Sequence, residues 1–171
     1  MVPAGRASSF PAMAPLSPYR SLPADRRLAL VTHDIAAHRQ SREGSIQRIV
    51  SRGGGFRRET LRKWTPAQLA REIVRANLET PQDELGLLQT LYVELEPAIQ
   101  VAFLEAANVA HDGASIPDDL KPPYTDAATV KSAAEALVNA HGDDGRRYLH
   151  TIALYNGDAW PGISDVLADL G

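Results

Sequence analysis

Apolar residues recur at helical spacing along the chain from residue 22 onward. One apolar stripe spans residues 28–35, and a second stripe at residues 46–50 resumes it about three helical turns later. Arg39 and Arg42 would interrupt this stripe if the helix were continuous. The pattern therefore favours a break near residues 41–44, and the alternative is one helix whose arginine side chains extend along its surface to solvent.

Two Thr-Pro pairs are the clearest signals for the start of a helix. Thr65 is followed by Pro66 and Gln68, which predicts an N-cap, a proline in the first helical position and a capping box. Thr80 and Pro81 repeat the pattern ahead of two acids, which favour the positive end of a helix. Both pairs therefore predict the first turn of a helix.

The remaining elements follow from prolines, glycines and apolar periodicity. Residues 97–110 are apolar on nearly every side, which predicts the central and most buried helix. The proline-rich stretch 111–125 predicts a long loop. We expect a helical hairpin over residues 126–155 with its turn at 141–143, followed by a short helix over 163–170.

These elements predict an all-α protein with a single compact bundle of about six or seven helices. The chain has 171 residues, 44% of them hydrophobic and 6% aromatic, which suits one domain with a core of packed helices. We place this domain at residues 22–171, with basic helices over 23–79 and acidic helices over 80–171. Residues 1–21 are rich in Pro, Ala and Ser and are predicted to form a disordered tail, because they cannot bury enough apolar surface.

The net charge of −3 conceals a strong asymmetry along the chain. Residues 1–75 hold 14 basic and 5 acidic side chains, a net charge of +9, whereas residues 76–171 hold 4 and 16, a net charge of −12. The two halves either pack together and partly neutralise each other, or each faces a different partner. The sequence leaves both alternatives open.

Composition excludes several classes of protein. The chain has no cysteine, which rules out disulfides and thiolate chemistry and is compatible with a reducing compartment. No apolar run reaches the roughly 20 residues of a membrane span. We therefore expect a cytoplasmic protein that does not enter a membrane, and no motif predicts a cofactor.

The arginine-rich stretch 39–75 is the strongest chemical signal. It includes a short, very basic segment at residues 56–64 that lies between two aromatic residues. Basic side chains neutralise phosphates, and neighbouring aromatic rings stack on unpaired bases. The alternatives are a solvated polar face or a surface complementary to the acidic half of the same chain. The candidate nucleic-acid-binding residues are Arg57, Arg58, Arg62, Lys63, Trp64, Arg71 and Arg75.

The five histidines give a weaker signal. His33 and His38 are five residues apart and so do not share one face of a helix, as paired zinc ligands do. His111, His141 and His150 lie near several aspartates, which suggests an acid–base or metal site assembled by folding. The aspartates are equally well explained as turn formers and helix caps, so we predict no catalytic and no metal-binding residue.

These observations favour a non-catalytic helical interaction module that binds a macromolecular partner. A protein partner or a second copy of the chain ranks first. A nucleic-acid-binding accessory protein that uses residues 39–75 ranks second, and an enzyme or metal protein with a His/Asp site ranks third. An apolar surface patch would favour the protein partner.

Overall fold

The computed structural model describes residues 17–170 of the chain, and the predicted tail at residues 1–16 lies outside this range. Residues 17–170 form eight α-helices and no β-strand, with one isolated bridge between Asp112 and Ser115. This confirms the all-α prediction. No described helix is long and apolar enough to cross a membrane.

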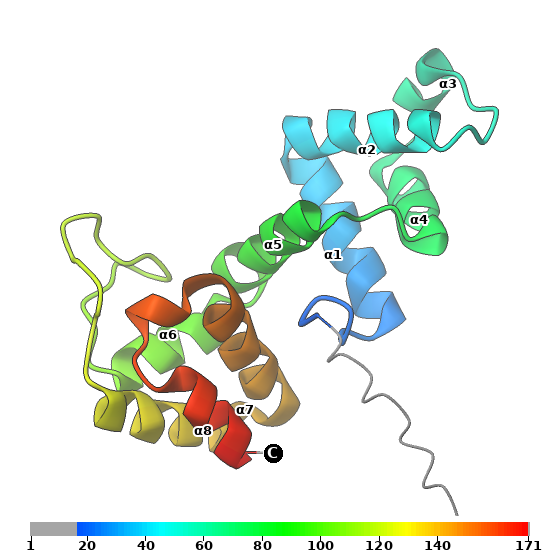
Figure 1. Ribbon diagram of the computed structural model, residues 1–171. Coiled ribbons are helices and arrows are strands. Elements are labelled where there is room, and N and C mark those ends of the chain that lie inside the picture. The colour runs from blue at the N-terminus through cyan, green and yellow to red at the C-terminus, as the bar shows by residue number, and fades with distance from the viewer. Residues whose placement is uncertain (1–16, 171) are drawn as a thin grey trace, which may run out of the picture.

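The helices follow one another with short connections, apart from the loop before α7 (Figure 1). In chain order they are α1 (Ala24–Ala37), α2 (Arg39–Ser51), α3 (Arg58–Arg62), α4 (Pro66–Ala76), α5 (Pro81–Thr90), the π-helix η1 (Leu91–Leu95), α6 (Pro97–Ala106), α7 (Ala127–Asn156), the 3-10 helix η2 (Gly157–Ala159) and α8 (Ile163–Leu170).

Both predicted Thr-Pro starts are confirmed. The side chain of Thr65 accepts a hydrogen bond from the Gln68 backbone, and the Gln68 side chain accepts one from the Thr65 backbone. Thr80 and Asp83 make the same reciprocal pair at the start of α5. The apolar pattern predicts that the helix after Thr65 ends near Glu79, but α4 ends at Ala76 because Asn77 adopts a left-handed conformation with φ of 56°.

The predicted break near residues 41–44 is wrong by a few residues. The chain breaks at His38, which is extended with φ of −116° and ψ of 113°. The His38 ring lies 3.0 Å from Asp34 and 3.1 Å from Glu94, so contacts outside its own segment hold the bend. Because the break comes earlier, Arg39 is exposed at the first position of α2 and does not interrupt an apolar stripe.

α6 is less enclosed than its composition predicts. Phe103 and Leu104 are fully buried, but Val101 is only half-buried. The helix packs on α7 and η1, and its remaining side stays near the surface. The spacing of apolar residues from Leu85 to Leu95 predicts that Leu95 lies on the inward face, but it is 41% exposed because the wider π-helical turn rotates it away from the apolar face of α5. The prediction that α6 is the most buried helix is therefore wrong, since three of the ten residues of α6 are buried and four of the ten of α5.

α7 folds back on itself at the predicted hairpin turn. Gly142 has φ of 55° and ψ of −127°, which is not helical, and separates the two arms. The arms come so close that a Cβ atom on Gly145 would lie 2.9 Å from the Leu137 carbonyl oxygen. Glycine is therefore required at both positions, for the backbone angle at one and for close approach at the other.

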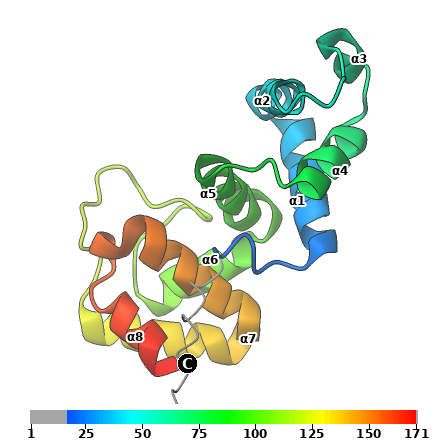
Figure 2. The ribbon, with the colours of Figure 1, turned by 45° about the vertical axis from the view of Figure 1, so that its right-hand side comes forward.

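The helices gather in two groups that share one apolar core (Figures 1 and 2). Helices α1–α4 form the first group, helices α6–α8 form the second, and α5 lies between them. Residues 17–22, most of which the sequence pattern assigned to the tail, pack against this junction, and Tyr19 is fully buried there. The packed domain therefore includes residues ahead of the predicted start at 22.

Candidate functional site

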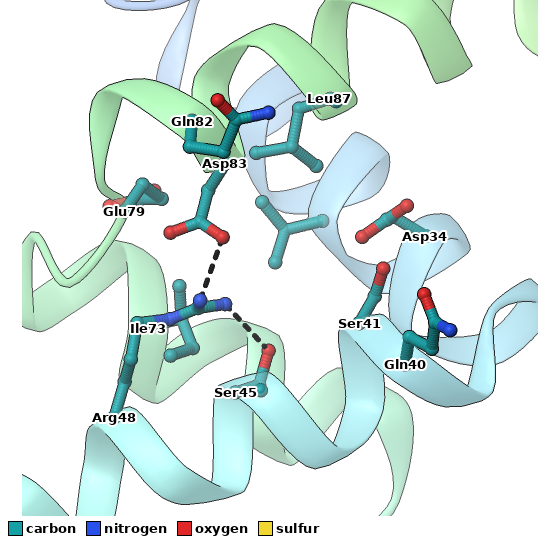
Figure 3. Close-up of a pocket in the computed structure, with 13 residues that line it drawn as sticks. Asp34, Gln40, Ser41, Ser45, Arg48, Ile73, Glu79, Gln82, Asp83 and Leu87 are labelled. Carbon is teal, nitrogen blue, oxygen red and sulfur yellow. Dashed lines mark hydrogen bonds and ion pairs between the residues drawn. The ribbon is translucent and has the colours of Figure 1, made fainter.

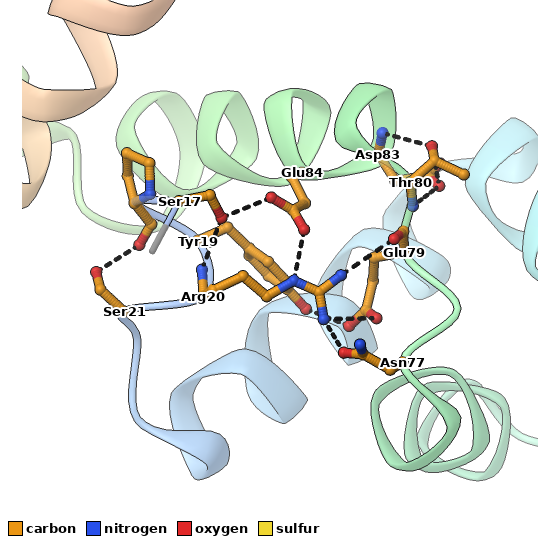
Figure 4. Close-up of polar contacts among 10 residues, drawn as sticks. Ser17, Tyr19, Arg20, Ser21, Asn77, Glu79, Thr80, Asp83 and Glu84 are labelled. Atoms are coloured by element: carbon orange, nitrogen blue, oxygen red, sulfur yellow. Dashed lines mark hydrogen bonds and ion pairs between the residues drawn. The ribbon is translucent and has the colours of Figure 1, made fainter. Parts of the chain in front are cut away.

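A buried polar cluster joins the N-terminal segment to the start of α5 (Figure 4). The Tyr19 hydroxyl donates a 2.6 Å hydrogen bond to the Glu79 carboxylate, and burial raises the pKa of Tyr19. Arg20 donates to Glu84 at 2.5 Å, and Ser17 donates to the same carboxylate at 2.6 Å. These acids have partners within the protein, so the cluster acts as a structural clamp.

Two further arginines connect the basic and acidic halves. Arg26 lies 2.5 Å from Glu96 and 2.6 Å from Asp144. Burial alone would raise the pKa of Asp144, but hydrogen bonds from Arg26 and Arg147 outweigh burial and lower it. Arg48 pairs with Asp83 at 2.7 Å. Part of the charge asymmetry is thus neutralised inside the molecule, by arginines that precede residue 49.

A polar pocket of about 270 Å³ lies between α1, α2, α4 and α5 (Figure 3). Arg48 extends into it and contacts Asp83 and Ser45. Asp34 lies on another wall and is held by His38 and Thr90. Its carboxylates are therefore engaged in protein contacts. Among residues 17–170, no group of three or more His, Asp or Glu side chains is placed to hold a metal ion.

The candidate basic residues lie on α3, α4 and the turns beside them. Arg57, Arg62, Lys63, Arg71 and Arg75 are exposed, and no ion pair in residues 17–170 joins any of them to the acidic half. Arg62 and Arg75 pair with Glu43 and Glu72, which lie in the basic half. These five residues therefore do not form the surface complementary to the acidic half that was one alternative for residues 39–75.

The side chains of three candidate cations, Arg57, Lys63 and Arg71, make no hydrogen bond or ion pair in the described part of the chain. The other three, Arg58, Arg62 and Arg75, pair with carboxylates of the basic half. Arg58 and Arg62 each lie 4.0 Å from Glu43, and Arg75 contacts Glu72 at 2.8 Å.

Trp64 forms one wall of a shallow hollow of about 190 Å³ on α4. Its ring meets Phe56 edge to face, with centroids 5.1 Å apart and planes at 71°. Arg42 fixes the turn that carries the ring, because it donates a 2.7 Å hydrogen bond to the Trp64 carbonyl. The hollow is completed by Gln68, Arg71, Glu72 and Arg75. Folding thus brings three of the candidate residues, Trp64, Arg71 and Arg75, into one hollow.

The histidines do not assemble as the third hypothesis requires. His33 and His38 both contact Glu94, across the junction between α1 and η1. His111 contacts the Gly113 carbonyl at 2.6 Å within its own loop. His111 shares a shallow hollow with Glu105, and neither His141 nor His150 lines that hollow.

A second cleft, which we call the tyrosine cleft, has a volume of about 350 Å³. It lies where α5 and η1 face the second arm of α7, and none of the described residues that line it carries a charge. Tyr92, Tyr148 and Trp160 are almost fully buried in its wall, whereas Val93 is 46% and Tyr155 37% exposed. The remaining lining residues are Leu85, Leu88, Gln89, Gln100, Ile116, Thr151, Ile152 and Asn156.

The tyrosines of the cleft are suited to binding rather than to proton transfer. Burial raises the pKa of Tyr92 and of Tyr148, so both hydroxyls stay neutral near pH 7. The Tyr92 hydroxyl is buried in the wall of the cleft, close to the Thr151 side chain. The cleft therefore offers a mixture of apolar side chains and uncharged polar ones, Gln89, Gln100, Thr151 and Asn156, to a ligand.

The sequence pattern did not indicate the tyrosine cleft. Apolar spacing places Tyr92 and Tyr155 on the inward faces of their helices, and residues so far apart in sequence give no sign that they line one cleft. Val93 was the only available signal, because it is a large apolar residue outside the stripe of its helix. Comparison of the chain with protein-family models, with curated proteins and with solved structures finds no match.

Proposed function

We propose that the protein is a non-catalytic helical module that binds an apolar segment of a partner protein in the tyrosine cleft. The observation that carries this proposal is a cleft with an uncharged lining and two large apolar residues, Val93 and Tyr155, exposed at its rim. Exposed apolar surface around a concave site is typical of interaction sites. The polar pocket at α2 lacks this character, because four charged residues line it.

Charge indicates what the partner segment carries beside its apolar residues. Residues 76–171, which supply the cleft, have a net charge of −12, and ion pairs with Arg20, Arg26 and Arg48 cancel only part of it. This field attracts cationic segments and repels acidic ones. The occupant is therefore an amphipathic segment with apolar side chains for the cleft and Lys or Arg at its flanks.

The π-helix η1 supports the same proposal. It carries both Tyr92 and Val93 into the cleft, at the junction between α5 and the proline that starts α6. Single π-helical turns occur often at functional sites, because a wide turn costs stability in an ordinary helix. In this protein, the π-helical turn places Val93 at the rim of the tyrosine cleft and the Tyr92 hydroxyl in its wall.

A single-tryptophan protein tests the proposal. The chain has two tryptophans, so Trp64→Phe leaves only Trp160, which lines the cleft. A short synthetic Leu/Lys peptide with one apolar helical face should change Trp160 fluorescence and saturate. A scrambled peptide of equal composition and charge should bind at least about tenfold more weakly, because it cannot place its leucines together.

Substitutions at the rim of the tyrosine cleft test whether the peptide binds there. Val93→Asn, made in the Trp64→Phe protein, should weaken binding of the amphipathic peptide about tenfold, since burial of one such side chain contributes roughly 1.5–3 kcal/mol. Leu95→Asn is the matched control, because Leu95 is similarly exposed on η1 and does not line the cleft. Equal affinities for both peptides, or equal losses in both variants, would contradict the proposal. Self-association that only Val93→Asn removes would replace the partner with a second copy.

A further inference from the structure

The surface around Trp64 keeps a local excess of positive charge after folding. Residues 52–75 hold seven cations and two carboxylates, Glu59 and Glu72. Glu72 is shared by Arg52 at 3.1 Å and Arg75 at 2.8 Å, so one carboxylate serves two arginines. The cationic excess on this face is therefore not cancelled within residues 52–75.

This surface is also distant from the acidic half. α3 and α4 lie at the opposite end of the molecule from α6–α8 in both views (Figures 1 and 2). Salt screens exposed charges beyond about 8 Å at physiological ionic strength. A ligand at α3 and α4 therefore responds to the local excess of cations more than to the net charge of −3.

The groups that remain available in the Trp64 hollow are hydrogen-bond donors beside an aromatic ring. Gln68 uses its side-chain oxygen to accept from the Thr65 backbone, and its amide nitrogen is left as a donor. Arg71 supplies a guanidinium that has no partner in residues 17–170. Arg75 holds Glu72 with some of its N–H groups. The hollow therefore suits a flat ligand whose edge and substituents accept hydrogen bonds.

We propose that this surface binds single-stranded nucleic acid, with one base stacked on Trp64. Arg75 flanks the stacked base, and Arg57, Lys63 and Arg71 each neutralise a neighbouring phosphate. Phe56, 37% exposed and edge-on to Trp64, extends the aromatic surface toward the next base.

The Trp64 ring favours nucleic acid over an acidic protein segment as the ligand. Arginines and lysines alone attract either polyanion, but an aromatic wall lined by donors adds affinity only for a ligand with a flat face. A duplex hides its base faces within the stack, so the strand must be single. The proposal is independent of the tyrosine cleft, because the two sites share no residue.

Titration with a labelled oligothymidylate across salt concentrations is the first test. If Arg57, Lys63 and Arg71 each neutralise one phosphate, the logarithm of the binding constant should fall with that of salt with a slope of about −2, at roughly −0.7 per phosphate. The triple substitution of these residues by Ala should remove most of this slope. A control with Arg39, Lys121 and Lys131 changed to Ala removes the same charge elsewhere and should keep the slope.

Trp64→Ala is the second test. Loss of base stacking should weaken oligothymidylate binding about tenfold and leave the salt slope unchanged. Trp64→Phe should retain most of the affinity, which separates stacking from a loss of fold. Circular dichroism melts of each variant show whether the helices are intact.

Three outcomes would overturn the proposal. They are an absence of oligothymidylate binding at low salt, equal affinity for duplex DNA of the same length, and equal affinity for polyglutamate with no change in Trp64 fluorescence. The last outcome would assign the surface to acidic protein segments. None of them bears on the peptide titration at Trp160, so each proposal fails separately.

Discussion

The two helical groups use aromatic residues in opposite ways. In the second group, Phe103 meets Tyr148 and Trp160 at centroid distances of 5.6 and 4.9 Å, and the three rings fill the core. In the first group the core is aliphatic, and the aromatic pair Phe56 and Trp64 lies at the surface among cations. A buried ring supports packing, whereas a ring left at the surface of a small protein is available to a ligand.

The acidic and basic halves of the chain also differ in how their charged side chains are paired. In the acidic half, Glu79, Glu84, Glu96 and Asp144 meet arginines from the N-terminal part of the chain. In the basic half, the cations of α3 and α4 meet at most a shared carboxylate. The halves therefore pack together through one set of charges and leave another set exposed.

The largest expected effect is at Phe103. Phe103→Ala should lower the free energy of unfolding by about 3–5 kcal/mol, because the ring is fully buried and leaves a cavity. Trp64→Ala should cost no more than about 2 kcal/mol, since part of its ring is already in water. Urea denaturation of both variants measures the difference. Equal losses would show that Trp64 supports packing as Phe103 does.

A smaller loss is expected at Tyr19. Tyr19→Phe removes the hydrogen bond to the buried Glu79 carboxylate and should cost about 1.5–3 kcal/mol, the range for hydrogen bonds to charged groups. Tyr124→Phe is the control, because the Tyr124 hydroxyl makes no hydrogen bond within the described residues. If the Tyr19 variant were as stable as the control, the clamp of Figure 4 would contribute nothing to folding.

The smallest effect concerns pH at the junction of α1 and η1. A hydrogen bond with Asp34 raises the pKa of His38 above its usual 6.5. The contribution of His38 to the free energy of unfolding is therefore complete below pH 6.5 and is lost as pH rises through the pKa of the folded protein. A hydrogen bond from His33 lowers the pKa of Glu94 below its usual 4.5. The contribution of Glu94 to the free energy of unfolding is therefore present above pH 4.5 and is lost at more acidic pH. The cluster therefore stabilises the fold most between these values.

His38→Gln tests this dependence. The variant should lose more stability relative to the original protein at pH 5.5 than at pH 8.5, as measured by urea denaturation at both pH values. A loss of equal size at the two pH values would mean that the His38 ring stabilises the bend by packing, with no contribution from its charge.

Local patterns were enough to predict most of the helices. The capping boxes at Thr65 and Thr80, the turn at Gly142 and the stop at residues 53–55 all depend on residues within a few positions of one another. The misplaced break at His38 shows where this reasoning fails, because Glu94, distant in sequence, helps to hold the bend. The exposure of Leu95 had a similar cause, a change of helical pitch that no periodic pattern indicates.

The helical class, the caps and the concentration of cations at residues 39–75 follow from the sequence alone, since they depend on hydrogen bonds between near neighbours, side-chain periodicity and residue counts. Contacts between distant segments specify which charges are neutralised, that Tyr19 is buried, and that residues between 85 and 160 form one uncharged cleft. Such contacts depend on how whole helices pack, which no local pattern specifies.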